Sequence, residues 1–425
     1  MQREKLTLNT ILIFFLVLFL VPLFWAIRGA NPERFSVIEN RTLAEFSLED
    51  RLLFSAVKQL ARGDFKSSSE IVDTQFHKRA FQNDFAKAVS DQFPLRIQAV
   101  QASKAINRLI ISSAYAFLPD QAIPADMQSE FYVTRDKQHL LYRPVSFTEE
   151  QKQVIDERLA NYQYLIETYP QINFSAYYLE RLQYSPYHPI NDYFNDVDER
   201  RSLTYFEENK PDELLFEKNM LNGFEDHVKY FYTSDNHLNI RGMVEIYNEV
   251  YDLLKQNYPE ISDRVDVKEY VTFPGVQFLG GLARITLFPL EPELFEVAVY
   301  DVPPYKIIDD GEEIIYTRSA DYWAGTNSFD RYANHYGDYF GLLKSNLEYH
   351  SDNDSERNLL YIGDSFSIPI YPMIASHYKN THFIDPRHDH DYTSARYLPL
   401  LDIDDVIIVG DATVLYTDIT WLIRP

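Results

Sequence analysis

Short apolar segments alternate with longer amphipathic ones along the second half of the chain. Apolar residues recur at helical spacing in 148–168, after Ser146 or Thr148 as a plausible N-cap, and again in 240–255. Short runs rich in β-branched and aromatic residues predict buried strands. They lie within 172–186, 359–362, 381–385 and 404–411. Helices that alternate with such strands predict an α/β fold with a mainly parallel sheet covered by helices on both faces.

Other segments are less regular. We expect helices near 52–61 and 69–112, the second broken at Pro94, and a further helix near 213–222. The segment 283–350 reads as a strand- and loop-rich insertion, in which "DDGEE" favours a hairpin turn.

The N-terminus carries the longest apolar run. Seventeen uncharged residues, 11–27, follow Arg3 and Lys5. This length is at the short end for a membrane span, and the preceding charges favour a cytoplasmic N-terminus with the remainder outside the cell. A cleaved signal peptide is the alternative, although Arg28 interrupts the small residues of a cleavage site. We therefore expect an anchor in 1–30, a helical stem in 31–140 and a catalytic domain in 141–425.

Composition narrows the function classes. The chain has 425 residues and no cysteine, which excludes thiol catalysis and thiolate metal sites. An exported chain without disulfides suits a Gram-positive-type cell surface. The net charge of −24 argues against nucleic acid as a partner.

The segment "RNLLYIGDSFSIPIYP" places a serine in a chemically favourable position. The strand 359–362 runs into Gly363, which permits a sharp turn, and Pro369 and Pro372 suit the start of a helix. This order would present Ser365 at the carboxyl end of the sheet, with its N–H near a helix N-terminus where negative charge is stabilised. The alternative is an ordinary turn between a strand and a helix.

A serine nucleophile needs a base within hydrogen-bond reach, and the chain has only 11 histidines. His237 follows Asp235 by two residues in "TSDNHLN", just before a helix. In a turn, the carboxylate could hold the imidazole in one tautomer and leave the other nitrogen free to accept a proton. The alternative is a helix start in which Asp235 or Asn239 caps and His237 is exposed.

Five short segments, in this order, resemble the DHHW proteins of the alginate O-acetyltransferase-like branch of the SGNH/GDSL hydrolases; they are "ENRTLAEF", "DQFPLR", "YFYTSDNHLNIRGM", "FLGG" and "LLYIGDSFS". The resemblance implies an SGNH-like, flavodoxin-like sheet with a circularly rearranged motif order, because the Asp-x-His pair precedes the serine. It implies Ser365 as nucleophile, His237 as base and Asp235 as the residue that orients the base.

The chain also departs from that family. The namesake Asp-His-His-Trp reads Asp235-Asn236-His237-Leu238, so the substrate contacts of the middle His and the Trp are in doubt. The resemblance further implies a Tyr after the nucleophile and an Arg in a later loop, for which Tyr371 and Arg387 are the candidates. The motifs do not locate the glycine and asparagine oxyanion donors of ordinary SGNH enzymes, and Gly280 or Gly281 is a guess for the glycine.

No other constellation predicts a metal or a cofactor. "DPRHDHDYTSAR" offers Asp385, His388, Asp389, His390 and Asp391, but a solvated loop at the carboxyl end of a strand explains these residues better than a metal site. Such a loop would lie on the same sheet edge as Ser365, where it could contact substrate.

Together these features predict a membrane-anchored extracytoplasmic serine acyltransferase. The group transferred would be acetyl, and the acceptor would be a cell-surface or secreted polysaccharide reached through an acyl-serine intermediate. The resemblance implies a polytopic membrane acyltransferase as donor partner. A carbohydrate acetylesterase is one alternative. A catalytically silent glycan-binding or scaffold module is another.

Overall fold

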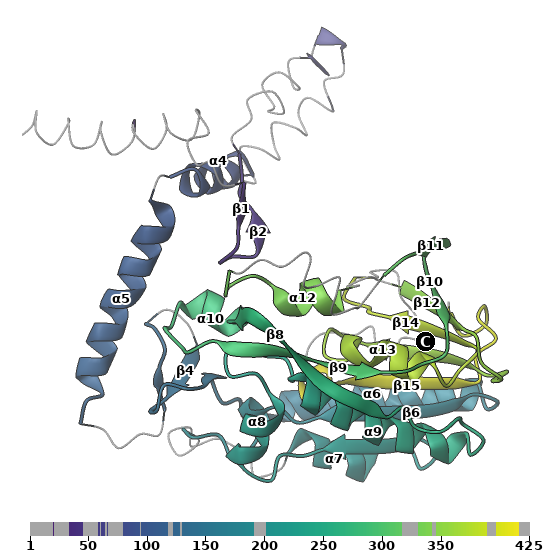
Figure 1. Ribbon diagram of the computed structural model, residues 1–425. Coiled ribbons are helices and arrows are strands. Elements are labelled where there is room, and N and C mark those ends of the chain that lie inside the picture. The colour runs from purple at the N-terminus through teal and green to yellow at the C-terminus, as the bar shows by residue number, and fades with distance from the viewer. Residues whose placement is uncertain are drawn as a thin grey trace, which may run out of the picture. The chain divides into compact units, whose positions relative to one another are not determined.

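The computed structural model describes residues 34–45, 80–93, 95–117, 122–127, 130–190, 201–316, 330–341, 346–388 and 397–415, with a few scattered residues between 20 and 66 (Figure 1). The chain divides into two compact units, 1–110 and 111–425. The expected anchor in 11–27 lies outside the described residues except for Leu20. Within the described part, no helix is both long and apolar enough to cross a membrane.

The first unit is held by a charge network between two of the segments that carry the family resemblance. It contains β1 (Phe35–Ser36), β2 (Arg41–Thr42), α4 (Ala80–Asp91) and most of α5 (Arg96–Ala114). The guanidinium of Arg41 donates to both oxygens of Asp91 at 2.7 Å, and the Ala44 N–H donates to the same carboxylate at 2.8 Å. Arg96 donates to Glu39 at 2.5 Å. Bidentate pairing satisfies the buried Asp91 charge and joins β2 to the end of α4.

The second unit is built on an eight-stranded sheet in the order β11-β10-β12-β14-β13-β15-β6-β7. The adjacent strands β14, β13, β15, β6 and β7 pair in parallel. Beyond β14, the pairs β14–β12, β12–β10 and β10–β11 are antiparallel. The bounds are β6 (Asn173–Leu179), β7 (Leu215–Asn219), β10 (Tyr305–Asp309), β11 (Glu312–Ile314), β12 (Asn346–Ser351), β13 (Asn358–Gly363), β14 (Asn380–Ile384) and β15 (Asp405–Asp411). The mainly parallel α/β sheet expected from the sequence is therefore confirmed.

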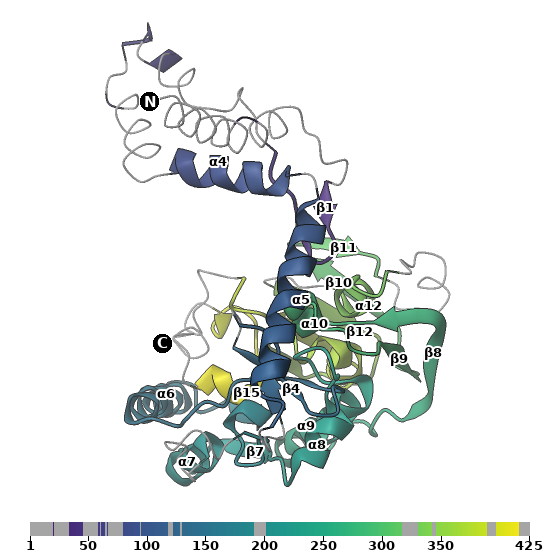
Figure 2. The ribbon, with the colours of Figure 1, turned by 90° about the vertical axis from the view of Figure 1, so that its left-hand side faces the viewer.

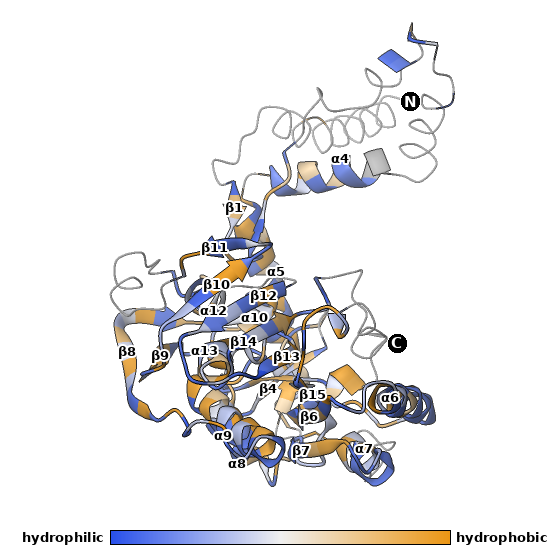
Figure 3. Ribbon diagram, turned by 90° about the vertical axis from the view of Figure 1, so that its right-hand side faces the viewer, coloured by the Kyte–Doolittle hydropathy of each residue, from blue (hydrophilic) through white to orange (hydrophobic). Residues whose placement is uncertain are grey.

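Helices cover both faces of this sheet, and successive residues of β6 alternate between the two cores. Phe174, Ala176 and Tyr178 pack with α6 (Glu149–Thr168) and α7 (Ser202–Asn209). Tyr177 and Leu179 pack on the other face with α9 (Ile240–Asn257) and α13 (Tyr371–Ala375). Figure 2 shows α6 and α7 on one side of the strands and α9 on the other. In Figure 3 these helices carry both polar and apolar residues, as a helix with one buried face requires.

Smaller elements complete the unit. A three-stranded sheet contains β3 (Ala122–Pro124), β4 (Phe131–Thr134) and β5 (Leu140–Tyr142). An antiparallel ribbon pairs β8 (Val267–Phe278) with β9 (Glu293–Tyr300). The remaining helices are short, and they are α8 (Phe224–Tyr230), α10 (Gly281–Thr286), α12 (His335–Phe340) and the 3₁₀ turns η2 (Leu182–Tyr184), η4 (Ile368–Ile370) and η5 (Ala412–Leu415).

Some of the helix ends and turns predicted from the sequence agree with the structure, and others do not. Thr148 caps α6 in a capping box with Gln151, and the "DDGEE" segment forms the β10–β11 turn with Asp310 and Gly311 at positive φ. The prediction of a helix near 213–222 is wrong, because this segment contains β7, which pairs with β6. The break expected near Pro94 falls between α4 and α5, although Pro94 itself lies outside the described residues. The expected helix near 52–61 lies mostly outside them as well.

Candidate active site

Ser365 lies in the turn that follows β13, at the carboxyl edge of the parallel strands. The turn begins at Gly363, where a Cβ would stand 2.8 Å from both Ser367 Oγ and a ring carbon of Tyr361, so only glycine fits. Asp364 Oδ1 accepts the Phe366 N–H at 2.9 Å and fixes the backbone around the serine. The Ser365 N–H itself has no hydrogen-bond partner among the described residues. It is therefore free to donate to a bound molecule.

His237 and Asp235 lie beside this turn, although His237 is 128 residues upstream of Ser365 in the sequence. His237 Nε2 is 3.1 Å from Ser365 Oγ, and His237 Nδ1 is 2.6 Å from Asp235 Oδ1. Asn239 caps α9, accepting the N–H groups of Arg241 and Gly242, while only 17% of the His237 side chain is exposed. The cap expected at Asn239 thus coexists with an inward-facing His237. The three side chains form one continuous hydrogen-bonded row.

Asp235 is buried and ionised. Burial acts to raise its pKa, but the charge and hydrogen bond of His237 and the N–H groups of Gly281 and His237 outweigh it, so the pKa falls to about 2. The Gly281 N–H donates to Asp235 Oδ2 at 2.5 Å, while the His237 N–H donates to Oδ1 at 3.0 Å. Asp235 is thereby held in one orientation.

The guess that Gly280 or Gly281 supplies an oxyanion donor is wrong, because both N–H groups are already committed. The Gly280 N–H donates to Ser234 Oγ at 3.0 Å, and the Gly281 N–H donates to Asp235. A Cβ at Gly280 would overlap the Asp235 carboxyl group. The two glycines thus leave room for Asp235 and hold it in place.

Tyr336, on α12, is a site residue that sequence reasoning missed. Its ring stacks on the His237 ring with centroids 4.2 Å apart, and its hydroxyl donates to the Ser365 carbonyl oxygen at 2.8 Å. Tyr371, the tyrosine that the resemblance implied, is only 3% exposed and stacks on Phe383 in the core. Tyr371 does not line the pocket, so the expectation that it contacts substrate is corrected. No local signal distinguishes Tyr336 among 32 tyrosines.

These residues open into a cavity of about 290 Å³. Arg387 lines it as expected, but its guanidinium is held by Asp385 at 2.9 and 2.5 Å. Burial acts to lower the Arg387 pKa, and the hydrogen bonds and charges of Asp385 and Asp364 outweigh it, so the guanidinium stays charged. The lining residues are Asp235, Asn236, His237, Gly281, Arg284, Asn334, Tyr336, Gly337, Phe340, Gly341, Ser365, Ile368, Arg387 and His388.

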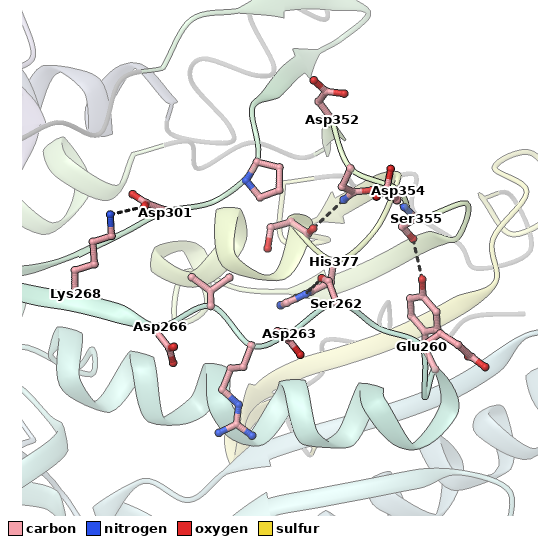
Figure 4. Close-up of a pocket in the computed structure, with 16 residues that line it drawn as sticks. Glu260, Ser262, Asp263, Asp266, Lys268, Asp301, Asp352, Asp354, Ser355 and His377 are labelled. Carbon is pink, nitrogen blue, oxygen red and sulfur yellow. Dashed lines mark hydrogen bonds and ion pairs between the residues drawn. The ribbon is translucent and has the colours of Figure 1, made fainter.

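A second contact between a serine and a histidine lies in a different pocket, of about 770 Å³. Ser262 Oγ is 2.7 Å from His377 Nδ1, and Figure 4 shows the two side chains together among acidic residues. His377 Nε2 contacts the Tyr247 hydroxyl at 2.8 Å, where Asp235 would stand in the first site. Burial lowers the His377 pKa to about 4. Without a carboxylate partner, this histidine is a weak base, and we assign the pair no chemistry.

In the described part of the chain, no group of three or more acidic or imidazole side chains is arranged to hold a metal ion. Of the "DPRHDHDYTSAR" residues, Asp385 and His388 are described, while Asp389, His390 and Asp391 lie outside the described residues. His388 lines the pocket, about half exposed.

No protein-family model and no curated protein matches the chain. Solved structures do match. PatB1 from Bacillus cereus with a sulfonyl adduct aligns with a TM-score of 0.50 and 16% identity over 69% of this chain and 99% of PatB1. A second PatB1 structure from Bacillus cereus aligns with a TM-score of 0.49 and 17% identity, over 68% of this chain and 98% of PatB1.

A DHHW family protein from Eubacterium siraeum aligns with a TM-score of 0.48 and 13% identity, over 68% of this chain and 93% of that protein. The family that the sequence motifs resemble is thus among the solved structures that match. The fold of this chain, over about two thirds of its length, is similar to that of PatB1.

Proposed function

We propose that this chain is a serine acyltransferase with an SGNH-like catalytic domain that transfers an acyl group, most simply acetyl, to a polysaccharide outside the cell. The observation that carries the proposal is the row of hydrogen bonds from Ser365 through His237 to Asp235. Ser365, at one end of this row, faces the pocket, and Asp235, at the other end, is a buried and ionised carboxylate. That arrangement is what a weak hydroxyl nucleophile needs.

The geometry supports a two-step reaction. His237 Nε2 accepts the Ser365 proton as Oγ attacks the carbonyl carbon of the acyl donor. The Ser365 N–H donates to the developing oxyanion. The tetrahedral intermediate then collapses, His237 returns the proton to the leaving group, and an acyl-serine remains. In the second step His237 deprotonates an acceptor hydroxyl, which attacks the acyl carbon. The bond between that carbon and Ser365 Oγ then breaks, and His237 returns the proton to Oγ.

The acceptor decides between transfer and hydrolysis. A sugar hydroxyl gives O-acylation, whereas water gives the carbohydrate esterase that is the second candidate. For this site we propose a sugar hydroxyl, with the membrane anchor in 11–27 holding the domain outside the cell. A polytopic membrane acyltransferase would supply the acyl group.

The test is covalent labelling of Ser365 in the full-length chain. Sulfonyl fluorides label activated serines, and a similar fold is known with a sulfonyl adduct, so phenylmethanesulfonyl fluoride and 4-nitrophenyl acetate are suitable probes. We expect one adduct by intact mass, on the peptide that contains Ser365. Ser365→Ala and His237→Ala should each lower labelling and ester hydrolysis by about a thousandfold or more.

Ser262→Ala is the matched control, because Ser262 also contacts a histidine but lacks the carboxylate. This variant should label like the parent. Labelling that survives in Ser365→Ala would remove Ser365 as nucleophile and return its turn to a structural role.

A further inference from the structure

Asp364, the residue before Ser365, belongs to a buried group of charges at the carboxyl edge of the sheet. The neighbouring strands β14, β13, β15 and β6 end side by side at this edge. At or just after their ends lie, in that order, Asp385, Asp364, Asp411 and Arg181, and Arg387 follows two residues after Asp385. The three aspartates are 4%, 7% and 2% exposed. Four strands thus bring charged side chains together beside the turn that carries the serine.

This group contains three carboxyl groups but only two guanidinium groups. Arg181 pairs with Asp411 at 3.3 Å. Arg387 donates two hydrogen bonds to Asp385, at 2.9 and 2.5 Å. Among the described residues, the carboxyl group of Asp364 is in no ion pair and accepts one backbone N–H, at 2.9 Å. Both guanidinium groups are therefore already paired with other aspartates.

Full ionisation of the three aspartates would leave one buried negative charge without a counter-ion. Such a charge is costly, and the carboxyl group with the least compensation holds a proton instead. Burial raises the pKa of Asp364 to about 6; the charges of Asp411 and Asp385 act in the same direction, and Arg387 acts against them. Asp364 is therefore a neutral acid at about pH 5 and an anion at about pH 8.

Other titratable groups near Asp364 do not supply the missing positive charge. Tyr361 on β13 and Tyr371 on α13 interact with it, and burial raises the pKa of both hydroxyl groups, which are therefore neutral. His388 Nε2 lies 3.9 Å from Asp385 Oδ2, but 49% of the His388 side chain is exposed, so water screens its charge. The state of Asp364 is thus set by the aspartates and arginines of this edge.

We infer that Asp364 is a positioning residue that must hold a proton for Ser365 to react efficiently, so that the site is active in mildly acidic surroundings and slowed in alkaline ones. The inference rests on the proposed function and adds the regulation of the site to it. In the proposed reaction the Ser365 N–H donates to the oxyanion, and an anion on the preceding residue would repel the negative charge that develops there. The neutral acid removes this repulsion and still accepts the Phe366 N–H, because that bond needs only a carboxyl oxygen.

The experiment compares the parent with Asp364→Asn, which has the shape of the neutral acid and cannot ionise. Sulfonylation of Ser365 by phenylmethanesulfonyl fluoride is followed by intact mass in the full-length chain, from about pH 5 to about pH 8. The readout is the ratio of the variant rate to the parent rate, because any effect of pH on the base His237 or on the reagent cancels in this ratio. We expect the ratio to rise by about tenfold across the range, and the rise to begin near pH 6.

Two further variants separate the proton from ordinary support of the turn. Asp364→Ala loses the acceptor of the Phe366 N–H as well as the acid, so it should react more slowly than the parent at every pH. Asp354→Asn is the matched control, since Asp354 is an exposed carboxylate in the loop before β13, at the opposite edge of the sheet, and its ratio should stay constant. A constant ratio in Asp364→Asn would overturn the inference. Failure of Asp364→Asn to fold would also overturn it, because the turn would then need the anion.

The melting temperature provides a readout that needs no reaction at Ser365. The Asp364 carboxyl group contributes stability below its unfolded pKa of about 3.8 and loses it as the pH rises through about 6. Asp364→Asn should therefore gain about 2 °C or more relative to the parent between about pH 5 and about pH 8. This gain without any labelling of Ser365 would refute the proposed function and support the proton on Asp364. Labelling of Ser365 without the gain would refute the inference alone.

Discussion

The ring of Tyr336 lies almost flat on the ring of His237, with 16° between the planes, while its hydroxyl holds the carbonyl oxygen of Ser365. One side chain therefore sets the position of the base and of the turn that carries the nucleophile. This relationship makes Tyr336 a positioning residue.

Two substitutions separate the contacts of Tyr336. Tyr336→Phe keeps the stacked ring and loses one hydrogen bond, which is expected to slow labelling of Ser365 by about threefold to tenfold. Tyr336→Ala removes both contacts and should slow it by about a hundredfold. The rate of sulfonylation, measured beside the melting temperature, is the check. Equal rates in the two variants would show that the stacking has no role.

Alanine substitutions at the neighbouring residues Gly280 and Gly281 should affect activity to different extents. Gly280→Ala drives a methyl group into the Asp235 carboxyl group, whereas Gly281→Ala makes only contacts of 3.5 Å or more. Ester hydrolysis should therefore fall at least about tenfold further in Gly280→Ala than in Gly281→Ala. The reverse order would mean that Asp235 moves without consequence for the site.

Because Glu293 is partly buried, we expect the free energy of unfolding to depend on pH. Burial raises its pKa to about 7, although the Thr233 N–H donates to its Oε2 at 2.9 Å. A carboxyl group with a raised folded-state pKa contributes stability below its unfolded pKa of about 4.5 and loses it as the pH rises through about 7. Glu293→Gln cannot ionise, so it should be more stable than the parent at about pH 8, by at most about 3 kcal/mol, and equal to it near pH 4. Melting temperatures across this range test the sign, and parallel curves would contradict it.

Asp405, at the start of β15, forms hydrogen bonds with residues at the starts of β13 and β6. It accepts two hydrogen bonds from Arg357, at 2.9 and 2.8 Å, and one from Asn173 Nδ2 at 2.8 Å. Asp405→Ala leaves both donors without this partner and should lower the free energy of unfolding by about 2–4 kcal/mol. The exposed Glu356–Lys379 pair is the control, because Glu356→Ala should cost less than about 1 kcal/mol. Urea unfolding of the two variants measures the difference, and similar midpoints would refute it.

The features that the sequence predicted are those set by neighbouring residues. The capping box at Thr148, the turn at Gly363 and the short apolar strands each depend on a few consecutive side chains. The 213–222 segment was misread because its strand is stabilised by pairing with β6, which is distant in sequence.

The same limit applies to the candidate site. Ser365, His237 and Asp235 were predicted from local motifs and a family resemblance, whereas Tyr336, Arg284 and the role of Gly280 depend on contacts that only the folded chain creates. Tyr371 illustrates the converse, because the family resemblance implied a contact that core packing on Phe383 prevents.

The position of β15 between β13 and β6 constrains how the chain folds. Asn173 pairs with Asp405, 232 residues later, so the middle of the sheet cannot close until residues 405–411 have been synthesised. Before then, β6 and the strand that leads to Ser365 each present an unpaired edge. Pairings of such long range also fold slowly. A chain that lacks residues 405–411 would therefore be both inactive and prone to aggregate, so the sheet of this topology can close only after those residues have been made.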